Sequence, residues 1–357
     1  MNILFLHGSR HELTPWRDGS TRYRCYHLAE SLRQKGHIAD IAPLTDVRIE
    51  HLNRYRTVCV LRPRPSKTLD QILKRCRRLG IRTVADVDDL VFIPRYSALS
   101  PSVINDQATE LSVRAQFKRN LQAMLCFDEI TVATEPLAHH WREQTGRSRV
   151  SVIPNGLSMR WLDTPVSRQT DPANEGRTIT YLPGSNSHNR DFSEIVDVLA
   201  DFVNRDKNIR LLIVGSLNTD ERKFPKARLS RSPWIDYFKL PQIIASSSVT
   251  LAPLVKSPFT HAKSHIKFIE SAAFGTPAIC SPNHDICRHD IDGLHIANTV
   301  DDWHAALQRT LDPPHDSAEL SRMKSYVRQN ATAGKSADTL LAHWKKEGSQ
   351  SLQNVAV

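Results

Sequence analysis

At residues 263–277 the chain reads Lys263-Ser264-His265-Ile266-Lys267-Phe268-Ile269-Glu270-Ser271-Ala272-Ala273-Phe274-Gly275-Thr276-Pro277. Ser264 is a favourable helix N-cap, and Gly275 with Pro277 forms a stop signal, so a short helix is predicted between them. Lys263, Lys267 and Glu270 are spaced four and three residues apart and therefore share one stripe of that helix.

The charged stripe has two interpretations. Two lysines four residues apart repel each other by about 0.2–0.5 kcal/mol unless a negative group lies between them. Because a helix N-terminus also favours anions, the segment can clamp a diphosphate, with Glu270 one turn deeper to accept hydrogen bonds from a ribose. It can equally be a solvated face with a Lys267–Glu270 ion pair, and the spacing alone does not decide between the two.

Short apolar runs alternate with helical patterns in both halves of the chain, which predicts an α/β protein with two Rossmann-like parallel sheets. In the first half we expect strands at 3–6, 38–41, 58–61, 83–87, 130–132 and 150–153, with helices at 22–34, 67–79, 111–125 and 136–144. In the second half we expect strands at 178–182, 210–214, 249–252 and 278–280, with helices at 192–203, 240–246, 264–274 and 302–311. Two more helices are expected at 317–329 and 336–346.

The predicted domains are residues 1–162 and 178–330, joined by a linker at 163–177 and followed by a C-terminal helix and tail at 331–357. The linker is rich in Pro, Asn, Ser and Gly and lacks apolar periodicity. In open parallel sheets, ligands bind outside the carboxyl ends of the strands, so we expect the functional residues there.

Other stretches of the chain occur in an order typical of one enzyme family. They are Gly19-Ser20-Thr21-Arg22-Tyr23-Arg24, Val152-Ile153-Pro154-Asn155-Gly156-Leu157, Leu182-Pro183-Gly184-Ser185-Asn186-Ser187-His188, Leu212-Ile213-Val214-Gly215, Leu251-Ala252-Pro253-Leu254 and Asp292-Gly293. Together with segment 263–277, they resemble the group 1 (family 4) glycosyltransferases over about residues 1–312. The resemblance implies the GT-B fold, in which two Rossmann-like domains face each other across a cleft and a C-terminal helix returns to the first domain.

The resemblance also implies a donor site for a nucleotide-diphosphate sugar. The residues it implies are Gly184, Ser185, His188, Lys263, Ser264, His265, Ile266, Lys267 and Glu270, with Arg22 contributed by the first domain. Many members have two glutamates with seven residues between them. Glu270 matches the second of these, whereas Ala262 stands at the first. The chain resembles instead a subgroup with a Lys-Ser-x-Ile-Lys donor motif.

Three carboxylates, Asp86, Asp88 and Asp89, come at the end of the predicted buried strand 83–87, where they are costly unless they bind something. We expect Asp88 or Asp89 to orient an acceptor hydroxyl or to act as a base. The alternatives are a metal site, a turn cap at Asp89 and an arginine partner for Asp86. The acceptor-binding candidates are Gly8, Arg24, Asp88 and Asp89, and the catalytic candidates are Asp88, Lys263 and Lys267. No metal or other cofactor is expected.

The composition is that of a globular protein, with 40% apolar residues in a chain of 357. No signal peptide or membrane-spanning run is evident, and the six cysteines lack CxxC spacing, so reduced thiols and a cytoplasmic location are expected. The motifs GxGxxG, GxxxxGK[ST] and GxSxG are absent, which disfavours dinucleotide dehydrogenases, P-loop NTPases and serine hydrolases.

Positive charge is concentrated in one part of a chain whose formal net charge is +10. Ten basic residues lie between positions 54 and 82, with Asp70 as the only acid: Arg54, Arg56, Arg62, Arg64, Lys67, Lys74, Arg75, Arg77, Arg78 and Arg82. Such a cluster indicates an anionic partner, namely membrane headgroups at the inner face of the membrane or a lipid-diphosphate acceptor. A nucleic-acid partner is disfavoured because no binding module accompanies the charge. The alternative is a basic surface without a partner.

These observations favour a glycosyltransferase, and the family resemblance implies that it retains anomeric configuration. It would move a sugar from a nucleotide-diphosphate sugar to a glycan or lipid-linked acceptor, in bacterial surface polysaccharide (lipopolysaccharide or capsule) biosynthesis. Two alternatives stay open. One is a nucleotide-sugar epimerase of the same fold, and the other is a non-catalytic partner subunit that keeps the fold, which the alanine at position 262 suggests.

Overall fold

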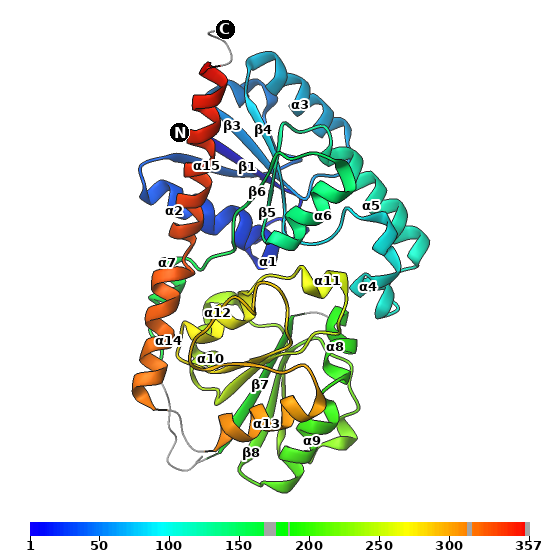
Figure 1. Cartoon of the computed structure of the whole chain (residues 1–357), viewed down its shortest axis with the longest axis vertical. Coiled ribbons are helices and arrows are strands. Elements are labelled where there is room, and N and C mark those ends of the chain that lie inside the picture. The colour runs from blue at the N-terminus through cyan, green and yellow to red at the C-terminus, as the bar shows by residue number, and fades with distance from the viewer. Residues whose placement is uncertain (168–175, 185, 313–315, 354–357) are drawn as a thin grey trace. The chain divides into compact units, whose positions relative to one another are not determined.

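The computed structural model describes residues 1–167, 176–184, 186–312 and 316–353. The chain forms two compact units. The first unit contains residues 1–95, 114–159 and 331–357, and the second contains residues 96–113 and 160–330. Each unit is built on one sheet of parallel strands (Figure 1).

The sheet of the first unit has six parallel strands in the order β2-β1-β3-β4-β5-β6. Their bounds are Asn2–His7 (β1), Ile38–Pro43 (β2), Thr57–Leu61 (β3), Arg82–Val87 (β4), Glu129–Val132 (β5) and Val150–Val152 (β6). The helices associated with these strands are Gly19–Thr21 (α1), Leu28–Gln34 (α2), Lys67–Leu79 (α3), Glu110–Met124 (α5), Glu135–Thr145 (α6) and Ala333–Gln353 (α15).

The C-terminal helix α15 packs on the first unit beside α2, as predicted (Figure 1). Its residues Ala337, Leu340, Leu341 and Trp344 join a buried cluster with side chains of β1 and α2. At the point of return, a Cβ added to Gly156 would lie 2.5 Å from the carbonyl of Thr332. The Asn155-Gly156 pair in the sequence is therefore required by close backbone packing against the returning chain.

The second sheet has the order β12-β11-β10-β7-β8-β9, also parallel. Its strands are Arg177–Gly184 (β7), Ile209–Gly215 (β8), Leu229–Ser232 (β9), Val249–Ala252 (β10), Ala278–Cys280 (β11) and Leu294–Ile296 (β12). The helices are Pro101–Ile104 (α4), Met159–Leu162 (α7), Asn189–Ser193 (α8), Val196–Arg205 (α9), Leu240–Ala245 (α10), Pro258–His261 (α11), Ile266–Ala272 (α12), Val300–Leu311 (α13) and Ser317–Asn330 (α14).

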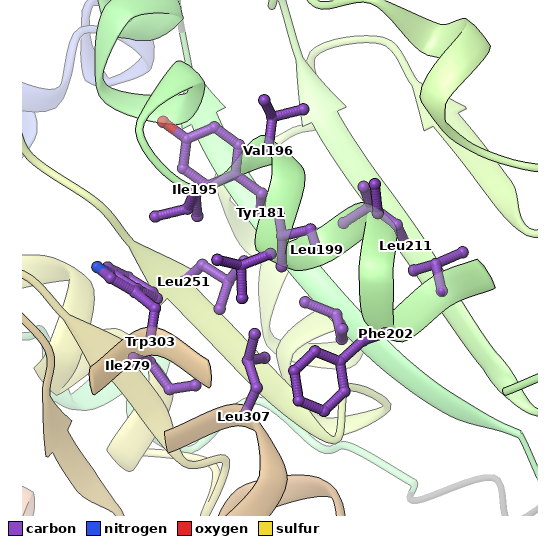
Figure 2. Close-up of a cluster of buried hydrophobic side chains, with 14 of the residues drawn as sticks. Tyr181, Ile195, Val196, Leu199, Phe202, Leu211, Leu251, Ile279, Trp303 and Leu307 are labelled. Carbon is purple, nitrogen blue, oxygen red and sulfur yellow. The ribbon is translucent and has the colours of Figure 1, made fainter. Parts of the chain in front are cut away.

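The core of the second unit lies between this sheet and helices α9 and α13. Figure 2 shows Leu199 and Phe202 of α9 and Trp303 and Leu307 of α13 gathered over strand residues such as Leu251. All of these side chains are buried. This apolar layer holds the strands in register and so fixes where their carboxyl ends emerge.

Several element boundaries differ from the prediction. The first helix begins at Gly19, because the Asp18 carboxylate accepts a hydrogen bond from the Thr21 N–H (2.9 Å) and caps it there. It then passes through a wide π-helical turn at Arg22–His27 before α2 begins. The helix predicted at 192–203 is divided into α8 and α9, and strands β9 and β12 were not predicted.

Candidate functional site

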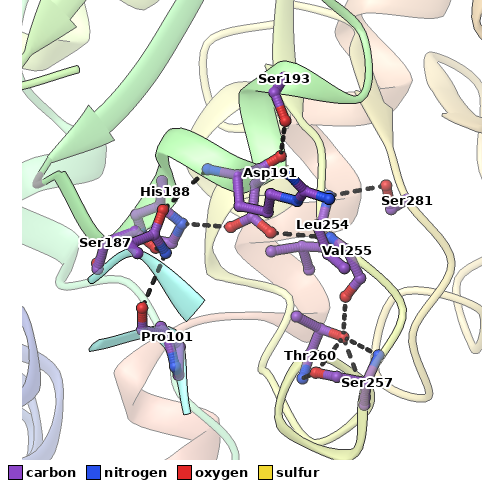
Figure 3. Close-up of polar contacts among 12 residues, drawn as sticks. Pro101, Ser187, His188, Asp191, Ser193, Leu254, Val255, Ser257, Thr260 and Ser281 are labelled. Atoms are coloured by element: carbon purple, nitrogen blue, oxygen red, sulfur yellow. Dashed lines mark hydrogen bonds and ion pairs between the residues drawn. The ribbon is translucent and has the colours of Figure 1, made fainter. Parts of the chain in front are cut away.

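A buried carboxylate organises the carboxyl edge of the second sheet. Asp191 of α8 accepts a hydrogen bond from His188 Nδ1 through Oδ2 (2.8 Å) and another from the Val255 N–H through Oδ1 (2.8 Å). Figure 3 shows Asp191 between these two partners. The side chain thus joins the segment that follows β7 to the segment that follows β10, two neighbouring strands.

The same contact sets the protonation of His188. A carboxylate only accepts hydrogen bonds, so the proton of the neutral ring is on Nδ1 and Nε2 keeps its lone pair. Burial lowers the pKa of His188, and the charges of Lys263 and Lys267 lower it further, against the opposing effect of Asp191. His188 is therefore neutral at pH 7 and presents a hydrogen-bond acceptor, which suits a hydroxyl group.

The loop that leads from β10 to the lysines is held by its own hydrogen bonds. The Leu254 N–H donates to Ser281 Oγ (2.9 Å), and Thr260 Oγ1 donates to the Val255 carbonyl (2.6 Å). Ser257 and Thr260 form a capping box at the start of α11. These contacts, shown in Figure 3, give the loop that leads to Lys263 a defined conformation.

Helix α12 begins at Ile266, with His265 as its N-cap residue and no capping bond from its own side chain. Lys263 is half-buried, and no described carboxylate lies within ion-pair distance of it. Lys267 is exposed, and its Nζ lies 3.7 Å from Oε2 of the buried Glu270, the ion pair that the spacing allowed. Ser264 and Ile266 are half-buried.

His265 supports the start of α12 from within. Its backbone N–H donates to Asp285 Oδ2 (2.9 Å), so a carboxylate twenty residues away in sequence holds the N-cap residue of α12. Its ring is buried, with Nδ1 at 2.8 Å from His289 Nε2 and 2.9 Å from the Arg288 guanidinium. The side chain is thus enclosed by protein groups.

Gly184, the last residue of β7, has the conformation its position requires. Gly184 has φ +76°, and a Cβ added there would meet no atom within 4 Å, so the backbone is open on that side. Such a glycine lets a ligand approach the main chain closely. The predicted donor residue Ser185 lies outside the described residues.

The predicted acceptor residues of the first unit are largely engaged with protein. The Arg24 guanidinium donates to both carboxylate oxygens of Asp86 (2.8 and 2.6 Å) and to Asn155 Oδ1 (3.1 Å). Thr131 Oγ1 donates to Asp86 Oδ1 (2.6 Å). Arg24 and Asp86 are almost fully buried, so this ion pair ties the first helix to β4 and β5.

Asp88 and Asp89 share one arginine, Arg62, which was not among the predicted site residues. Arg62 Nε donates to Asp88 Oδ1 (2.6 Å), and its other nitrogen lies 3.6 Å from Asp89. Burial alone would raise the pKa of Asp88, but the charge and hydrogen bond of Arg62 and a hydrogen bond from Ser20 lower it on balance. Asp88 is therefore ionised, a hydrogen-bond acceptor and a weak base.

Arg22 is bound by nearby backbone groups, whereas Gly8 is exposed. Arg22 donates to the backbone carbonyls of Trp16 (3.0 Å) and Arg17 (3.1 Å), so its guanidinium is bound by the loop before α1. It lies in the second turn of the helix, because the capped end is at Gly19. Gly8 is exposed at the carboxyl end of β1, and a Cβ there would meet no atom within 4 Å.

The basic run between positions 54 and 82 does not form one surface. Arg56 precedes β3 and Arg82 begins β4, at the amino edge of the sheet, whereas Arg62 and Arg64 follow β3 at the carboxyl edge. A strand of five residues separates these edges by roughly 16 Å. The charges that are continuous in sequence are therefore divided between opposite ends of the first unit.

Two further properties bear on partners. Among the residues that the structure describes, no helix combines the length and apolar character needed to cross a bilayer. Within the same residues, no group of three or more His, Cys, Asp or Glu side chains is arranged to hold a metal ion.

Sequence reasoning missed Asp191, Arg62 and Asn105. Asn105 Nδ2 donates to the Ser187 carbonyl (2.8 Å), and its Oδ1 accepts from the Arg190 N–H (2.9 Å). It therefore positions the segment that contains His188. Its partners are more than eighty residues away in sequence, so no local pattern could have identified it.

The comparisons with known proteins concern the second unit most directly. Residues 177–313 match the family model described as "Glycosyl transferases group 1". No curated protein sequence matches the chain. The match begins with β7 and includes His188, Asp191 and segment 263–277.

The solved structures match nearly the whole chain. Anabaena Alr3699/HepE in complex with UDP and glucose has a TM-score of 0.65 and 11% identity, covering 97% of this chain and 100% of that one. A glycosyltransferase from Rickettsia africae has a TM-score of 0.62 and 11% identity, covering 97% and 98%. A putative UDP-N-acetylglucosamine 2-epimerase from Listeria monocytogenes has a TM-score of 0.56 and 10% identity, covering 98% and 97%. The chain therefore has the predicted GT-B fold.

Proposed function

We propose that this protein is a glycosyltransferase that transfers a sugar from a nucleotide-diphosphate sugar to a hydroxyl of a glycan or lipid-linked acceptor. The observation that supports this most strongly is the group formed by His188, Lys263 and Lys267 at the carboxyl edge of the second sheet. Asp191 hydrogen-bonds both to His188 and to the Val255 N–H in the loop that leads to Lys263, and the charges of the two lysines lower the pKa of His188. The site lies inside the segment that matches the glycosyltransferase family model.

The lysines are suited to the diphosphate. Lys263 is half-buried without a carboxylate partner among the described residues, and Lys267 has one at 3.7 Å. A diphosphate between them would replace their mutual repulsion with two charge-assisted contacts. As the sugar leaves, negative charge grows on the phosphate, and preorganised cations stabilise that charge most in the transition state. Lys263 and Lys267 thus bind the donor and promote departure of the nucleotide.

His188 and Glu270 are suited to hydroxyl groups. Neutral His188 accepts a hydrogen bond at Nε2, and we assign it to a hydroxyl of the donor sugar. Glu270 is buried beside Lys267. We assign it two tasks, orienting Lys267 and accepting hydrogen bonds from the ribose.

We assign Asp88 to the acceptor hydroxyl as a positioning group. Its lowered pKa keeps it ionised at neutral pH, which favours accepting a hydrogen bond over removing a proton. That property agrees with a retaining reaction in which no strong enzyme base is needed. Gly8, with open space at its α-carbon, leaves room for an acceptor at the end of β1.

The direct test is a thermal-shift panel of UDP, GDP, ADP, CMP and their common sugar conjugates on wild type, Lys263→Ala and Lys267→Ala. A ligand at about 100 times its dissociation constant adds roughly 2.7 kcal/mol of stability. We expect one nucleotide to raise the melting temperature of wild type strongly and that of the two variants weakly. If no nucleotide stabilises wild type, or all three proteins respond alike, the proposed donor site is wrong.

The fold also resembles that of a putative epimerase, so nucleotide-sugar epimerase activity is the alternative to test. An epimerase would convert the nucleotide sugar without any acceptor, so product analysis by chromatography separates the two activities. A non-catalytic subunit would show no turnover in either assay, and its function would be insensitive to Lys263→Ala. We further propose, from the sequence, that the acceptor belongs to surface polysaccharide assembly and that the reaction needs no metal.

A further inference from the structure

Two arginines follow neighbouring strands at the carboxyl edge of the first sheet, and a third lies on α5. Arg10 lies three residues after the end of β1, and Arg64 lies three residues after the end of β3. These strands are neighbours, with Leu6 paired to Val60 near their ends. Arg119 projects from α5, and all three arginines are exposed. Residues distant in sequence thus place positive charge on one edge.

The three charges are not neutralised by the protein. Among the described residues, no carboxylate lies within ion-pair distance of Arg10, Arg64 or Arg119, whereas Arg62 beside them has both Asp88 and Asp89. Partial burial, followed by the charges of Arg10, Arg62 and Arg119, lowers the pKa of Arg64. These side chains are therefore close enough to repel one another, and a bound anion would relieve that repulsion.

The segment that presents Arg64 is rigid. It is flanked by Pro63 and Pro65, whose rings fix their own φ angles. Ser66 Oγ accepts from the Leu69 N–H (3.1 Å) and starts α3 immediately afterwards. Before it, Arg62 has φ +45°, a conformation that is costly for a non-glycine residue and is often found at functional sites. The Arg62 N–H donates to the Asp86 carbonyl (2.8 Å), which holds that turn.

The part of α5 that contains Arg119 is held against the segment after β4. The next residue, Asn120, donates from Nδ2 to the Val91 carbonyl (2.9 Å), which joins α5 to the segment after β4. That segment follows Asp88 and Asp89 directly. The backbone of Arg64 and of Arg119 is therefore supported by neighbouring elements of the unit that contains Asp88, the carboxylate assigned to the acceptor hydroxyl.

We propose that Arg10, Arg64 and Arg119 form a binding site for a phosphate or diphosphate group of the acceptor, placed beside Asp88. The acceptor class rests on the proposed glycosyltransferase function, whereas the anion site itself does not. Guanidinium groups form paired hydrogen bonds with phosphate oxygens, and three of them match the charge of a phosphate or diphosphate. A single carboxylate would leave two of the charges unneutralised. The substrate is therefore a phosphorylated acceptor whose hydroxyl lies near Asp88.

Two sources supply this chemistry, a soluble sugar phosphate and a polyprenyl diphosphate lipid. The first arm of the test titrates glucose 6-phosphate, with glucose as control, by calorimetry. The second arm measures co-flotation with phosphatidylcholine vesicles that contain about 5 mol% undecaprenyl diphosphate. Vesicles with the same charge supplied by phosphatidylglycerol serve as control. Binding in either arm that exceeds its control supports the site and identifies the source.

The variants are Arg10→Ala and Arg64→Ala, with Arg78→Ala as the matched control. Arg78 is an exposed arginine in the last turn of α3, near the opposite edge of the sheet, and its substitution removes the same charge. We expect at least a tenfold loss of affinity for the better probe in each site variant, a smaller loss in Arg64→Lys, and less than a twofold change in Arg78→Ala. Equal losses in Arg64→Ala and Arg78→Ala, or no binding beyond the controls by wild type in both arms, would overturn the proposal.

The nucleotide panel separates this outcome from the proposed function. Arg64→Ala should keep the nucleotide response of wild type, because its site and the donor site use different residues. If wild type binds the phosphate probe but no nucleotide, the anion site stands and the glycosyltransferase proposal fails. If wild type binds nucleotide but neither phosphate probe, the anion site is wrong and the glycosyltransferase proposal stands.

Discussion

Both sheets have six parallel strands, in different orders, and they use charge differently at their carboxyl edges. In the first unit, Arg24 and Asp86 form a buried, doubly hydrogen-bonded ion pair. In the second, Lys263 has no carboxylate partner among the described residues, and exposed Lys267 has a longer contact of 3.7 Å. A charge at a strand end is therefore not by itself a ligand-binding residue. What distinguishes the two edges is whether the protein already satisfies the charge.

The largest expected effect comes from breaking the buried pair in the first unit. Arg24→Ala leaves Asp86 buried and without its cation, so we expect a loss of about 3–5 kcal/mol in the free energy of unfolding. Urea denaturation followed by circular dichroism measures it. Arg78→Ala removes a surface arginine and should stay within about 0.5 kcal/mol of wild type. A loss below about 1 kcal/mol for Arg24→Ala would contradict a structural role.

The second prediction concerns pH and the helix that contains Arg24. Burial lowers the pKa of His27 to about 4, and its Nδ1 lies 3.0 Å from the Gly156 carbonyl. Because the folded protein resists protonation while the unfolded chain binds a proton near pH 6.5, stability is lost as pH falls from 6.5 toward 4. The shift corresponds to about 3 kcal/mol.

His27→Asn keeps a donor near the Gly156 carbonyl but cannot titrate. The free energies of unfolding of wild type and His27→Asn are measured from pH 7 to pH 4. Wild type should lose about 3 kcal/mol more than the variant over this range, so that the two values converge at low pH. Parallel curves would show that His27 does not contribute to acid sensitivity.

The third prediction concerns the unneutralised charge of the second unit. Lys263→Ala removes one charge-assisted contact to a diphosphate, worth about 1.5–3 kcal/mol, so nucleotide affinity should fall by roughly 10- to 150-fold. Its unfolding free energy in the absence of ligand should change little. Calorimetric titration and denaturation of the same samples check both parts. A large stability loss would mean that Lys263 has a structural role like that of Arg24.

The smallest effect is expected at Gly184, the last residue of β7. Gly184→Ala meets no steric obstacle, but φ +76° is unfavourable for alanine, so we expect a loss of about 1 kcal/mol. Gly8→Ala is the matched control, since it also meets no atom within 4 Å and has no positive φ. If both substitutions have the same effect on unfolding, the left-handed conformation at Gly184 is not what the position requires.

Local signals explain which elements could be predicted from sequence. Helix α3 has the predicted bounds because Ser66 caps its start and Gly80, with φ +64°, ends it, both within the segment itself. Strands β9 and β12 were missed because Leu229-Ser230-Arg231-Ser232 and Leu294-His295-Ile296 are too short or too polar to show a strand pattern.

Long-range contacts explain what the sequence could not reveal about the site. The spacing of Lys263, Lys267 and Glu270 pointed to a shared stripe, but Asp285, which holds the backbone of the N-cap residue His265, comes from a distant loop. Arg62 could be seen as one of ten basic residues, yet nothing local showed that it is the one bound to Asp88. Which charges are satisfied depends on partners brought together by the sheet.

The most direct test of this account is a calorimetric titration of the nucleotide selected by the thermal-shift panel into wild type, Lys263→Ala and Arg64→Ala. We predict at least a tenfold loss of affinity in Lys263→Ala and an unchanged affinity in Arg64→Ala, because only the second unit's lysines bind the donor diphosphate. Unchanged affinity in Lys263→Ala, or equal losses in both variants, would contradict the assignment of the donor site to the second sheet.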